Sequence, residues 1–372
     1  MAGGLLTLAC LDVGSTFTKA VLVDEDDGAV LAGAARPTTT PATTGGDVLD
    51  GVRAALADLR GRGAPVPDLA EPERVLVCSS AGGGLRLAVV GYERQVTAEA
   101  GHRVGLSAGA RVVHVAAGPL RGEGVTELRA ARADVVLLVG GTDGGNADVL
   151  VHNARALARA RVGAPVVVAG NVEAAGEVAT ELAATGRRYR VTDNVLPRIG
   201  EVSPAPAREA IREVFLEHVI GGKGLSRGPA FASLVRAPTP DAVLAGVARL
   251  AEVRGEDVLL VDVGGATTDV YSVLTPEGED ATIRRDVVGT LWHARTVEGD
   301  LGMRWNAPGS WEAGVAEGLL DRDDEPLRRW VAACHADPGR VPRDHTESAL
   351  DLRLAAVAVR VAARRHVQPL SH

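Results

Sequence analysis

Three short apolar runs at the start of the chain alternate with polar positions in the two-residue period of β-strands. The runs LLTLACLDV, TKAVLVD and AVLAGAAR within residues 5–35 are separated by Gly, Asp, Ser and Thr, which predicts a hairpin followed by a third strand. Apolar residues then recur at helical spacing near 47–60, where Asp47 stands in the position of a helix cap. Together with a buried strand expected at RVLVCSS, these elements predict one α/β lobe over residues 1–80.

Beyond residue 80 the pattern changes to short apolar runs that are separated by helical stretches. The runs are RVVHVAAG, ADVVLLVGG, APVVVAGN and YRVTDN. Such alternation predicts parallel βαβ units, so we expect an inserted parallel α/β subdomain over 81–200. Helical periodicity predicts connecting helices over 201–255, with Thr239 as a cap. Residues 256–372 open with another apolar hairpin and are expected to form a second lobe.

Composition sets broad limits on the class of protein. A chain of 372 residues with 46% apolar content can bury the cores of two or three domains. The net charge of −8 and the lack of a long basic run argue against nucleic acid as a partner. No apolar stretch reaches the roughly 18 residues of a membrane span, so we expect a cytoplasmic protein with no membrane contact. The three widely spaced cysteines predict neither disulfides nor a zinc or iron–sulfur site.

One hairpin motif occurs twice in the chain. The segments LDVGSTFTKAVLV, residues 11–23, and VDVGGATTDVYSV, residues 261–273, both place an apolar strand, an aspartate, a glycine turn, hydroxyl residues and a second apolar strand in that order. The alignment pairs Asp12 with Asp262, Gly14 with Gly264, Ser15 with Gly265, Thr18 with Thr268 and Lys19 with Asp269. Two matching hairpins 250 positions apart indicate a duplicated lobe.

Phosphate binding explains this combination of residues. A glycine turn lets backbone N–H groups approach phosphate oxygens, because a Cβ atom there would block the contact. Side-chain hydroxyls and the ammonium of Lys19 can add further contacts to the same oxygens. The predicted phosphate-binding residues are therefore Gly14, Ser15, Thr16, Thr18, Lys19, Gly264, Gly265, Thr267 and Thr268.

The two aspartates require a different explanation. A carboxylate beside polyphosphate repels it unless a cation intervenes, so Asp12 and Asp262 are predicted to bind, through water, the Mg²⁺ carried by a nucleotide. We assign them the catalytic and metal roles, with the two hairpins clamping one set of phosphates. The alternative is that Asp-x-Gly at a strand end is ordinary turn chemistry. The repetition of the whole pattern favours phosphate binding.

At these residues the chain resembles the actin, sugar-kinase and heat-shock chaperone superfamily, and within it the MutL/GlmL family associated with glutamate mutase. The closer resemblance extends over about residues 5–305 and includes VVLLVGGTDGGNADVLVHNARAL and VTDNVLPRIGEVSPAPAREAI. It implies two ribonuclease-H-like lobes, ATP and Mg²⁺ as cofactors, and an ATPase-like accessory factor that maintains or reactivates an adenosylcobalamin-dependent mutase.

Two absent motifs refine what the resemblance implies. The Asp-x-His-x-x-Gly signature of cobalamin-binding subunits is lacking, since the nearest match, AGHRVG with His102, has alanine in place of the aspartate. We therefore expect the chain to act on a mutase without carrying cobalamin. The glycine-rich adenosine loop of the superfamily is also missing, so the second lobe is expected to be incomplete at its C-terminus and nucleotide affinity to be weak.

Other interpretations stay open. A small-molecule kinase of the same superfamily, or a binding module that has lost hydrolysis, fits the same hairpins. The glycine-rich loops around Asp143, Asn146 and Asn171 follow strand ends, where α/β sheets bind ligands, but they also fit plain loop chemistry. Glu298 and Asp300 either orient a water molecule or serve a turn.

Overall fold

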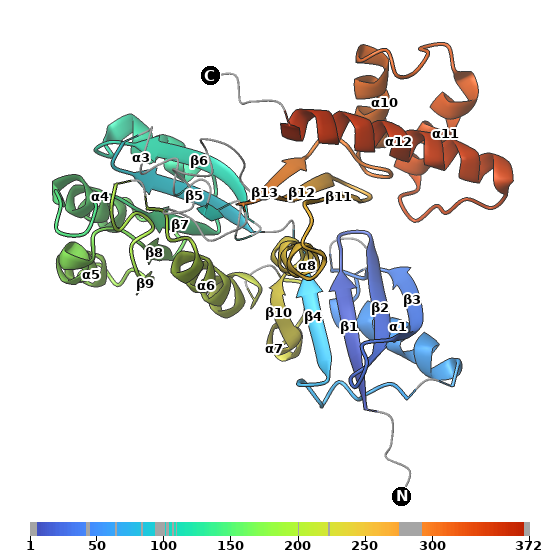
Figure 1. Cartoon of the computed structure of the whole chain (residues 1–372), viewed down its shortest axis with the longest axis horizontal. Helices are drawn as coiled ribbons and strands as arrows, with labels where there is room; N and C mark the ends of the chain where they lie inside the picture. The colour runs from blue at the N-terminus through green and yellow to red at the C-terminus, as the bar shows by residue number, and fades with distance from the viewer. Residues whose placement is uncertain are drawn as a thin grey trace, which may run out of the picture. The chain divides into compact units, whose positions relative to one another are not determined.

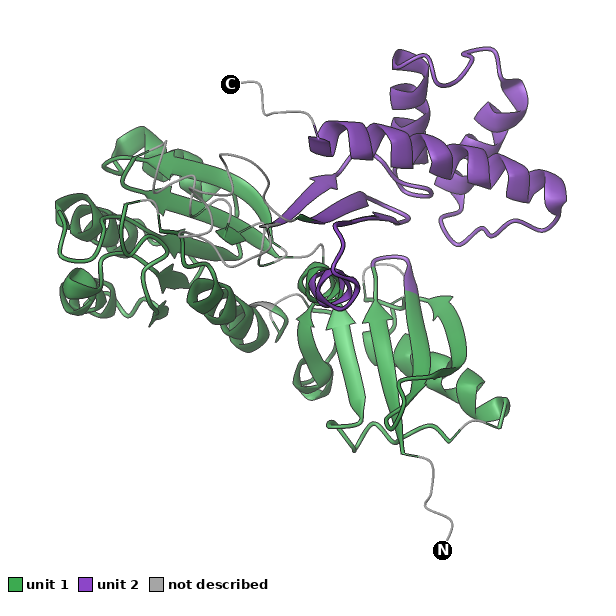
Figure 2. Cartoon of the chain, in the orientation of Figure 1, with its two compact units in different colours: residues 1–14, 18–246, 274–292 green, residues 15–17, 247–273, 293–372 purple. Residues whose placement is uncertain are grey.

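The computed structural model describes residues 6–41, 45–63, 65–82, 85–93, 101, 104–105, 108, 110–199, 201–221, 224–274 and 292–367. The chain divides into two compact units (Figure 2). Unit 1 comprises residues 1–14, 18–246 and 274–292, and unit 2 comprises residues 15–17, 247–273 and 293–372. The architecture is mixed α/β with parallel sheets, as the alternation of apolar runs predicts.

The first sheet of unit 1 contains the hairpin at the start of the chain (Figure 1). Its strand order is β10-β4-β1-β2-β3. The strands are β1 (Thr7–Val13), β2 (Phe17–Asp24), β3 (Val30–Pro37), β4 (Val75–Ser79) and β10 (Val235–Pro238). β1 pairs antiparallel with β2 and parallel with β4. The three strands expected at the start of the chain and the strand at RVLVCSS are therefore confirmed.

Helix α1 (Val48–Gly61) covers this sheet and begins where the sequence predicts. Asp47 caps it by accepting a hydrogen bond from the backbone of Leu49, and Asp50 bonds back to the N–H of Asp47. The apolar side chains that recur at helical spacing on α1 are buried in one cluster with β1 residues such as Leu11. Sequence periodicity and capping therefore predict this helix correctly.

The second sheet of unit 1 is fully parallel, with strand order β6-β5-β7-β8-β9. Its strands are β5 (Arg86–Gly91), β6 (Arg111–Ala117), β7 (Val135–Leu138), β8 (Val166–Val168) and β9 (Tyr189–Val191). The helices between and after them are α3 (Gly122–Ala130), α4 (Asp148–Arg159), η2 (Val172–Ala174), α5 (Ala175–Ala183) and α6 (Ala205–Val214). One face packs on α3, α4 and α5, and the other packs on α6. Burial on both faces explains why β7 is an uninterrupted apolar run.

The expectation that residues 201–255 form only connecting helices is wrong at one place. After α6, η3 (Phe215–Val219) and α7 (Ala230–Leu234), the chain forms strand β10, which pairs parallel with β4. Helix α8 (Thr239–Arg254) follows directly. A four-residue edge strand that ends in proline is too short to show a periodicity, and its pairing partner lies far away in the sequence.

Unit 2 combines a small sheet with a helical segment (Figure 1). The sheet has the order β11-β12-β13 and contains β11 (Val258–Val263), β12 (Thr268–Leu274) and β13 (Trp292–Glu298). The helices are α10 (Ala307–Ala316), α11 (Glu325–Ala336) and α12 (His345–Val367). Side chains of α12 pack on β11 and β12 in one apolar cluster. No helix in the described part of the chain is long and apolar enough to cross a membrane.

Candidate functional site

The first hairpin places an acid and a base side by side near its turn. Asp12 on β1 and Lys19 on β2 are cross-strand neighbours, and Lys19 Nζ lies 3.6 Å from Asp12 Oδ2. The Lys19 side chain is 61% exposed and that of Asp12 is 29% exposed. Both belong to the accessible face of the hairpin, because the alternate positions Leu11 and Val13 are buried. The predicted metal ligand and phosphate contact therefore lie together.

A residue that the sequence does not link to the site contacts Asp12. Thr239, the first residue of α8, donates a hydrogen bond from Oγ1 to Asp12 Oδ1 at 2.8 Å. The sequence predicts Thr239 as a helix cap. Its position beside Asp12 depends on β10 joining the sheet, which local periodicity does not reveal.

Cys78 also faces this carboxylate. Its Sγ atom lies 3.7 Å from Asp12 Oδ1 and 3.6 Å from the carbonyl oxygen of Leu11. Burial, together with the negative charge of Asp12, raises the pKa of the Cys78 thiol to about 12. The thiol is therefore protonated at neutral pH, which fits a small buried side chain rather than a nucleophile.

The turn of the first hairpin is held by threonines. Thr38 donates its hydroxyl hydrogen to the carbonyl oxygen of Gly14 at 2.9 Å, and Thr18 Oγ1 lies 3.1 Å from Thr38 Oγ1. Because Thr38 uses its hydrogen on Gly14, Thr18 must be the donor in the second bond. Thr18 is fully buried, so we leave it out of the phosphate site.

The second hairpin has the same register but a different charge pattern. Asp262 faces Asp269 across the strands, where the first hairpin has Lys19. Arg295 on β13 donates to Asp269 Oδ1 from Nε at 2.9 Å and also from Nη2, and it lies 5.7 Å from the ring centroid of Tyr271. The Arg295 side chain is only 5% exposed. Its charge therefore neutralises Asp269 inside the protein.

The segment 303–306, which follows β13, donates hydrogen bonds to the turn of the second hairpin, residues 264–267. Three successive turn carbonyls accept hydrogen bonds from it: Gly264 from Met303 N at 3.0 Å, Gly265 from Arg304 N at 2.8 Å, and Ala266 from Asn306 Nδ2 at 2.6 Å. Among the described residues, the N–H groups of Gly265, Ala266 and Thr267 have no hydrogen-bond acceptor. The turn is thus fixed through its carbonyls, and these three N–H groups remain available as hydrogen-bond donors.

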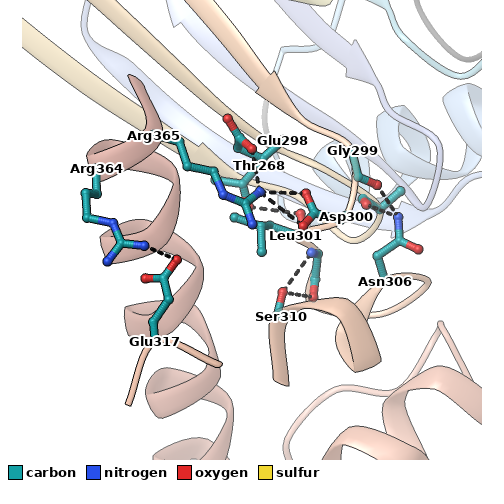
Figure 3. A network of polar contacts seen from close by, with 12 residues as sticks. Thr268, Glu298, Gly299, Asp300, Leu301, Asn306, Ser310, Glu317, Arg364 and Arg365 are labelled. Carbon is teal, nitrogen blue, oxygen red and sulfur yellow. Dashed lines mark hydrogen bonds and ion pairs between the residues drawn. The ribbon is translucent and has the colours of Figure 1, made fainter. Parts of the chain in front are cut away.

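Figure 3 shows how the supporting segment is held in place. Ser310 on α10 bonds both the N–H and the carbonyl of Gly302 at 2.9 Å. Thr268 donates its hydroxyl to the carbonyl of Leu301 at 3.1 Å and is fully buried. Like Thr18, Thr268 therefore uses its hydroxyl inside the protein, and we leave it out of the phosphate site. Thr267 lies in the turn and donates its hydroxyl hydrogen to Asp269 Oδ2 at 3.3 Å, so this hydroxyl is also used within the protein.

Glu298 and Asp300 form part of the same network (Figure 3). Arg365 on α12 donates to Glu298 Oε2 at 2.6 Å and to both carboxylate oxygens of Asp300, at 2.9 and 3.0 Å. The hydrogen bond from Arg365 lowers the pKa of Asp300. This arrangement supports the structural interpretation of the two acids rather than a role in orienting water.

Comparison with known proteins identifies the family of this chain. The family model described as MutL protein matches residues 8–372. Protein MutL of Clostridium tetanomorphum is 37% identical over 367 residues, which cover 96% of this chain and 78% of that protein. The chain belongs to the MutL protein family. The resemblance inferred from its sequence motifs is confirmed.

Solved structures add little to this assignment. The xylulose kinase of Bifidobacterium adolescentis is 10% identical and covers 97% of this chain and 83% of its own, with a TM-score of 0.26. A likeness of that size supports no conclusion about a common fold.

The loops at the ends of the parallel strands are occupied by contacts within the protein. Asn194 donates to Asp143 Oδ1 at 2.8 Å, and the N–H of Val172 donates to the same oxygen at 3.1 Å. Asn171 donates to the carbonyl of Gly145 at 2.9 Å, and Asn146 accepts from the neighbouring backbone. These bonds favour ordinary loop chemistry for this region. His102 lies outside the described residues.

No group of three or more His, Cys, Asp or Glu side chains that could hold a metal occurs in the described ranges. The residues present nevertheless fit a hydrated Mg²⁺ that arrives with phosphate. Asp12 keeps a partly exposed carboxylate next to Lys19, and the turn N–H groups of Gly265 and Ala266 have no acceptor among the described residues. In the turn of the first hairpin, the Oγ1 atom of Thr16 is buried with no hydrogen-bond partner among the described residues.

Replacing Gly302 with alanine should destabilise unit 2 by about 2 kcal/mol or more. A Cβ atom at this position would lie 2.7 Å from backbone atoms of Ala266 and 2.8 Å from the carbonyl oxygen of Gly265, so the turn itself must move. Urea denaturation measures the effect. Gly246→Ala is the matched control, because Gly246 lies in α8 with open space around it and should gain up to about 1 kcal/mol. Equal stability of the two variants would contradict the described packing.

His366 should make the stability of unit 2 depend on pH. Its ring nitrogens lie 2.9 Å from Thr296 Oγ1 and 2.9 Å from Ser272 Oγ, and burial lowers its pKa below the ordinary 6.5. A lowered folded-state pKa gives stability that is complete above the unfolded pKa and is lost as the pH falls through the folded pKa. Urea denaturation over this range should show a smaller loss for His366→Gln than for the unchanged chain. Identical pH profiles would contradict the prediction.

Proposed function

We propose that this protein is a nucleotide-dependent accessory factor that reactivates or assembles an adenosylcobalamin-dependent mutase such as glutamate mutase. The observation that supports nucleotide binding is the pair of hairpins with one register, in which an aspartate precedes a glycine turn. Membership of the MutL protein family supports the choice of partner. We further propose that both hairpin lobes are ribonuclease-H-like and that their hairpins bind the phosphates of one ATP.

Each hairpin residue has a defined task in this proposal. Asp12 and Asp262 would hold Mg²⁺ through its water ligands, and the bound ion would offset the charge of the phosphates. The N–H groups of Gly265 and Ala266 have no acceptor among the described residues, and they donate to phosphate oxygens. The carbonyl groups of the same residues accept hydrogen bonds that fix the turn. Ser15 is exposed in the first turn and presents a hydroxyl for the same purpose.

The two hairpins contribute unequally to the charge at the site. The first carries the exposed ammonium of Lys19 opposite Asp12. At the equivalent position the second hairpin carries Asp269, and Arg295 neutralises it inside the protein. We therefore assign the most negative part of the nucleotide, its terminal phosphate, to the first hairpin.

The test is capture of the mutase by the purified chain with and without Mg-ATP, with phosphate release measured in the same samples. Nucleotide-dependent capture of a glutamate mutase component is the expected result, because nucleotide binding should change the conformation that the partner recognises. Phosphate release separates a hydrolysing factor from a binding module that only responds to ATP. Capture that is absent, or equal with and without ATP, would contradict the proposal.

A further inference from the structure

We propose that Thr239 is the positioning residue for Asp12, fixing its carboxylate for the Mg²⁺ of the bound nucleotide. The inference rests on the proposed function, because it concerns how that site is held rather than what it binds. The observation behind it is the 2.8 Å hydrogen bond from Thr239 Oγ1 to Asp12 Oδ1. A carboxylate can only accept here, so the direction of the bond is fixed.

The two carboxylate oxygens of Asp12 have different surroundings. Oδ1 receives the hydroxyl of Thr239 and faces the thiol of Cys78, whereas Oδ2 lies nearest to Lys19 Nζ at 3.6 Å. Oδ1 is therefore turned into the protein, and Oδ2 is directed to the accessible face. Oδ2 would therefore be the oxygen that holds a hydrated Mg²⁺, and the restricted rotation of the carboxylate would lower the entropy lost on binding.

Thr239 is itself held firmly. It is 8% exposed and follows Pro238, the last residue of β10, whose pairing with β4 places it next to the strand that pairs with β1. As a β-branched residue it has few side-chain rotamers. The start of α8 is further anchored by Asp241, whose Oδ2 accepts a 2.6 Å hydrogen bond from Arg212 on α6.

A purely structural role for Thr239 makes a different prediction. If the bond only stabilised the junction between β10 and α8, its removal would lower stability and would affect nucleotide binding equally with and without Mg²⁺. If Thr239 positions Asp12, its removal weakens binding chiefly when Mg²⁺ is present, because only then does Asp12 take part. The Mg²⁺ dependence of ATP binding therefore separates the two roles.

The experiment measures ATP affinity of the full chain by calorimetry, in Mg²⁺ and in EDTA, for Thr239→Val, Thr239→Ser and Thr126→Val. Valine keeps the branched shape without the hydroxyl, and serine restores the hydroxyl. Thr126 is the matched control, since it lies exposed on α3 and bonds only its own helix. Thr239→Ala replaces Thr239→Val if circular dichroism shows that the valine variant is unfolded.

We expect Thr239→Val to weaken Mg-ATP binding about ten- to a hundredfold, the effect of losing one hydrogen bond to a charged group. Affinity in EDTA should not change, and Thr239→Ser and Thr126→Val should bind Mg-ATP like the unchanged chain. Unaltered Mg-ATP binding by Thr239→Val, or an equal loss in EDTA, overturns the role of Thr239 alone. Absence of ATP binding by the unchanged chain would overturn the proposed function and this inference with it.

Discussion

Asp12→Asn should weaken Mg-ATP binding about a hundredfold, the largest effect on binding that we expect from one substitution. Asparagine has nearly the same shape and still accepts the hydrogen bond of Thr239, so the change removes the charge and little else. A neutral amide is a poor partner for hydrated Mg²⁺. It also leaves Lys19 without its cross-strand acid.

Calorimetric titration with Mg-ATP measures this loss, and Asp26→Asn provides the control. Asp26 is an exposed acid in the turn at the opposite end of β2, so its substitution changes the net charge by the same amount. The control should bind like the unchanged chain. Similar affinities of Asp12→Asn and Asp26→Asn would show that Asp12 has no contact with the metal.

Asp269→Ala should lower the stability of unit 2 by about 3–5 kcal/mol, the range measured when one partner of a buried ion pair is removed. The side chains of Asp269 and Arg295 are 13% and 5% exposed, so the variant leaves a guanidinium charge with little access to water. The pair also links β12 to β13 beside the second turn. Loss of Asp269 should therefore loosen the turn as well.

Urea denaturation measures the change, with two comparisons. Glu252→Ala breaks the exposed pair with Arg249 and should cost less than about 1 kcal/mol. The double substitution Asp269→Leu with Arg295→Met removes both charges and should recover most of the lost stability. If Asp269→Ala were as stable as Glu252→Ala, Arg295 and Asp269 would not form a buried ion pair.

The hairpins and the parallel strands could be predicted because their apolar patterns are local. The same periodicity could also have corrected one part of the site. Thr18 occupies the same face of β2 as Ala20 and Leu22, which are buried. The alternation of the strand therefore predicts that the Thr18 hydroxyl faces the interior. Thr268 stands in the same relation to Val270 on β12. The predicted phosphate site included every hydroxyl residue of the two hairpins and did not consider which face of the strand each one occupies. It therefore contained more hydroxyl groups than the structure leaves accessible.

Other parts of the site depend on contacts that no local pattern contains. Thr239 reaches Asp12 only because β10, with four residues, adds to a sheet formed by strands much earlier in the chain. Arg295 reaches Asp269 from a third strand. In both cases tertiary pairing decides which side chains meet, and composition or spacing gives no signal for it.

The stoichiometry of Mg-ATP binding tests the central claim, that both hairpins bind the phosphates of one nucleotide, most directly. Calorimetry on the unchanged chain, Asp12→Ala and Asp262→Ala should give one ATP per chain for the first and strongly weakened binding for each variant. Two ATP per chain, with each variant retaining one, would show separate sites, and unchanged titrations in both variants would show that neither aspartate serves the nucleotide.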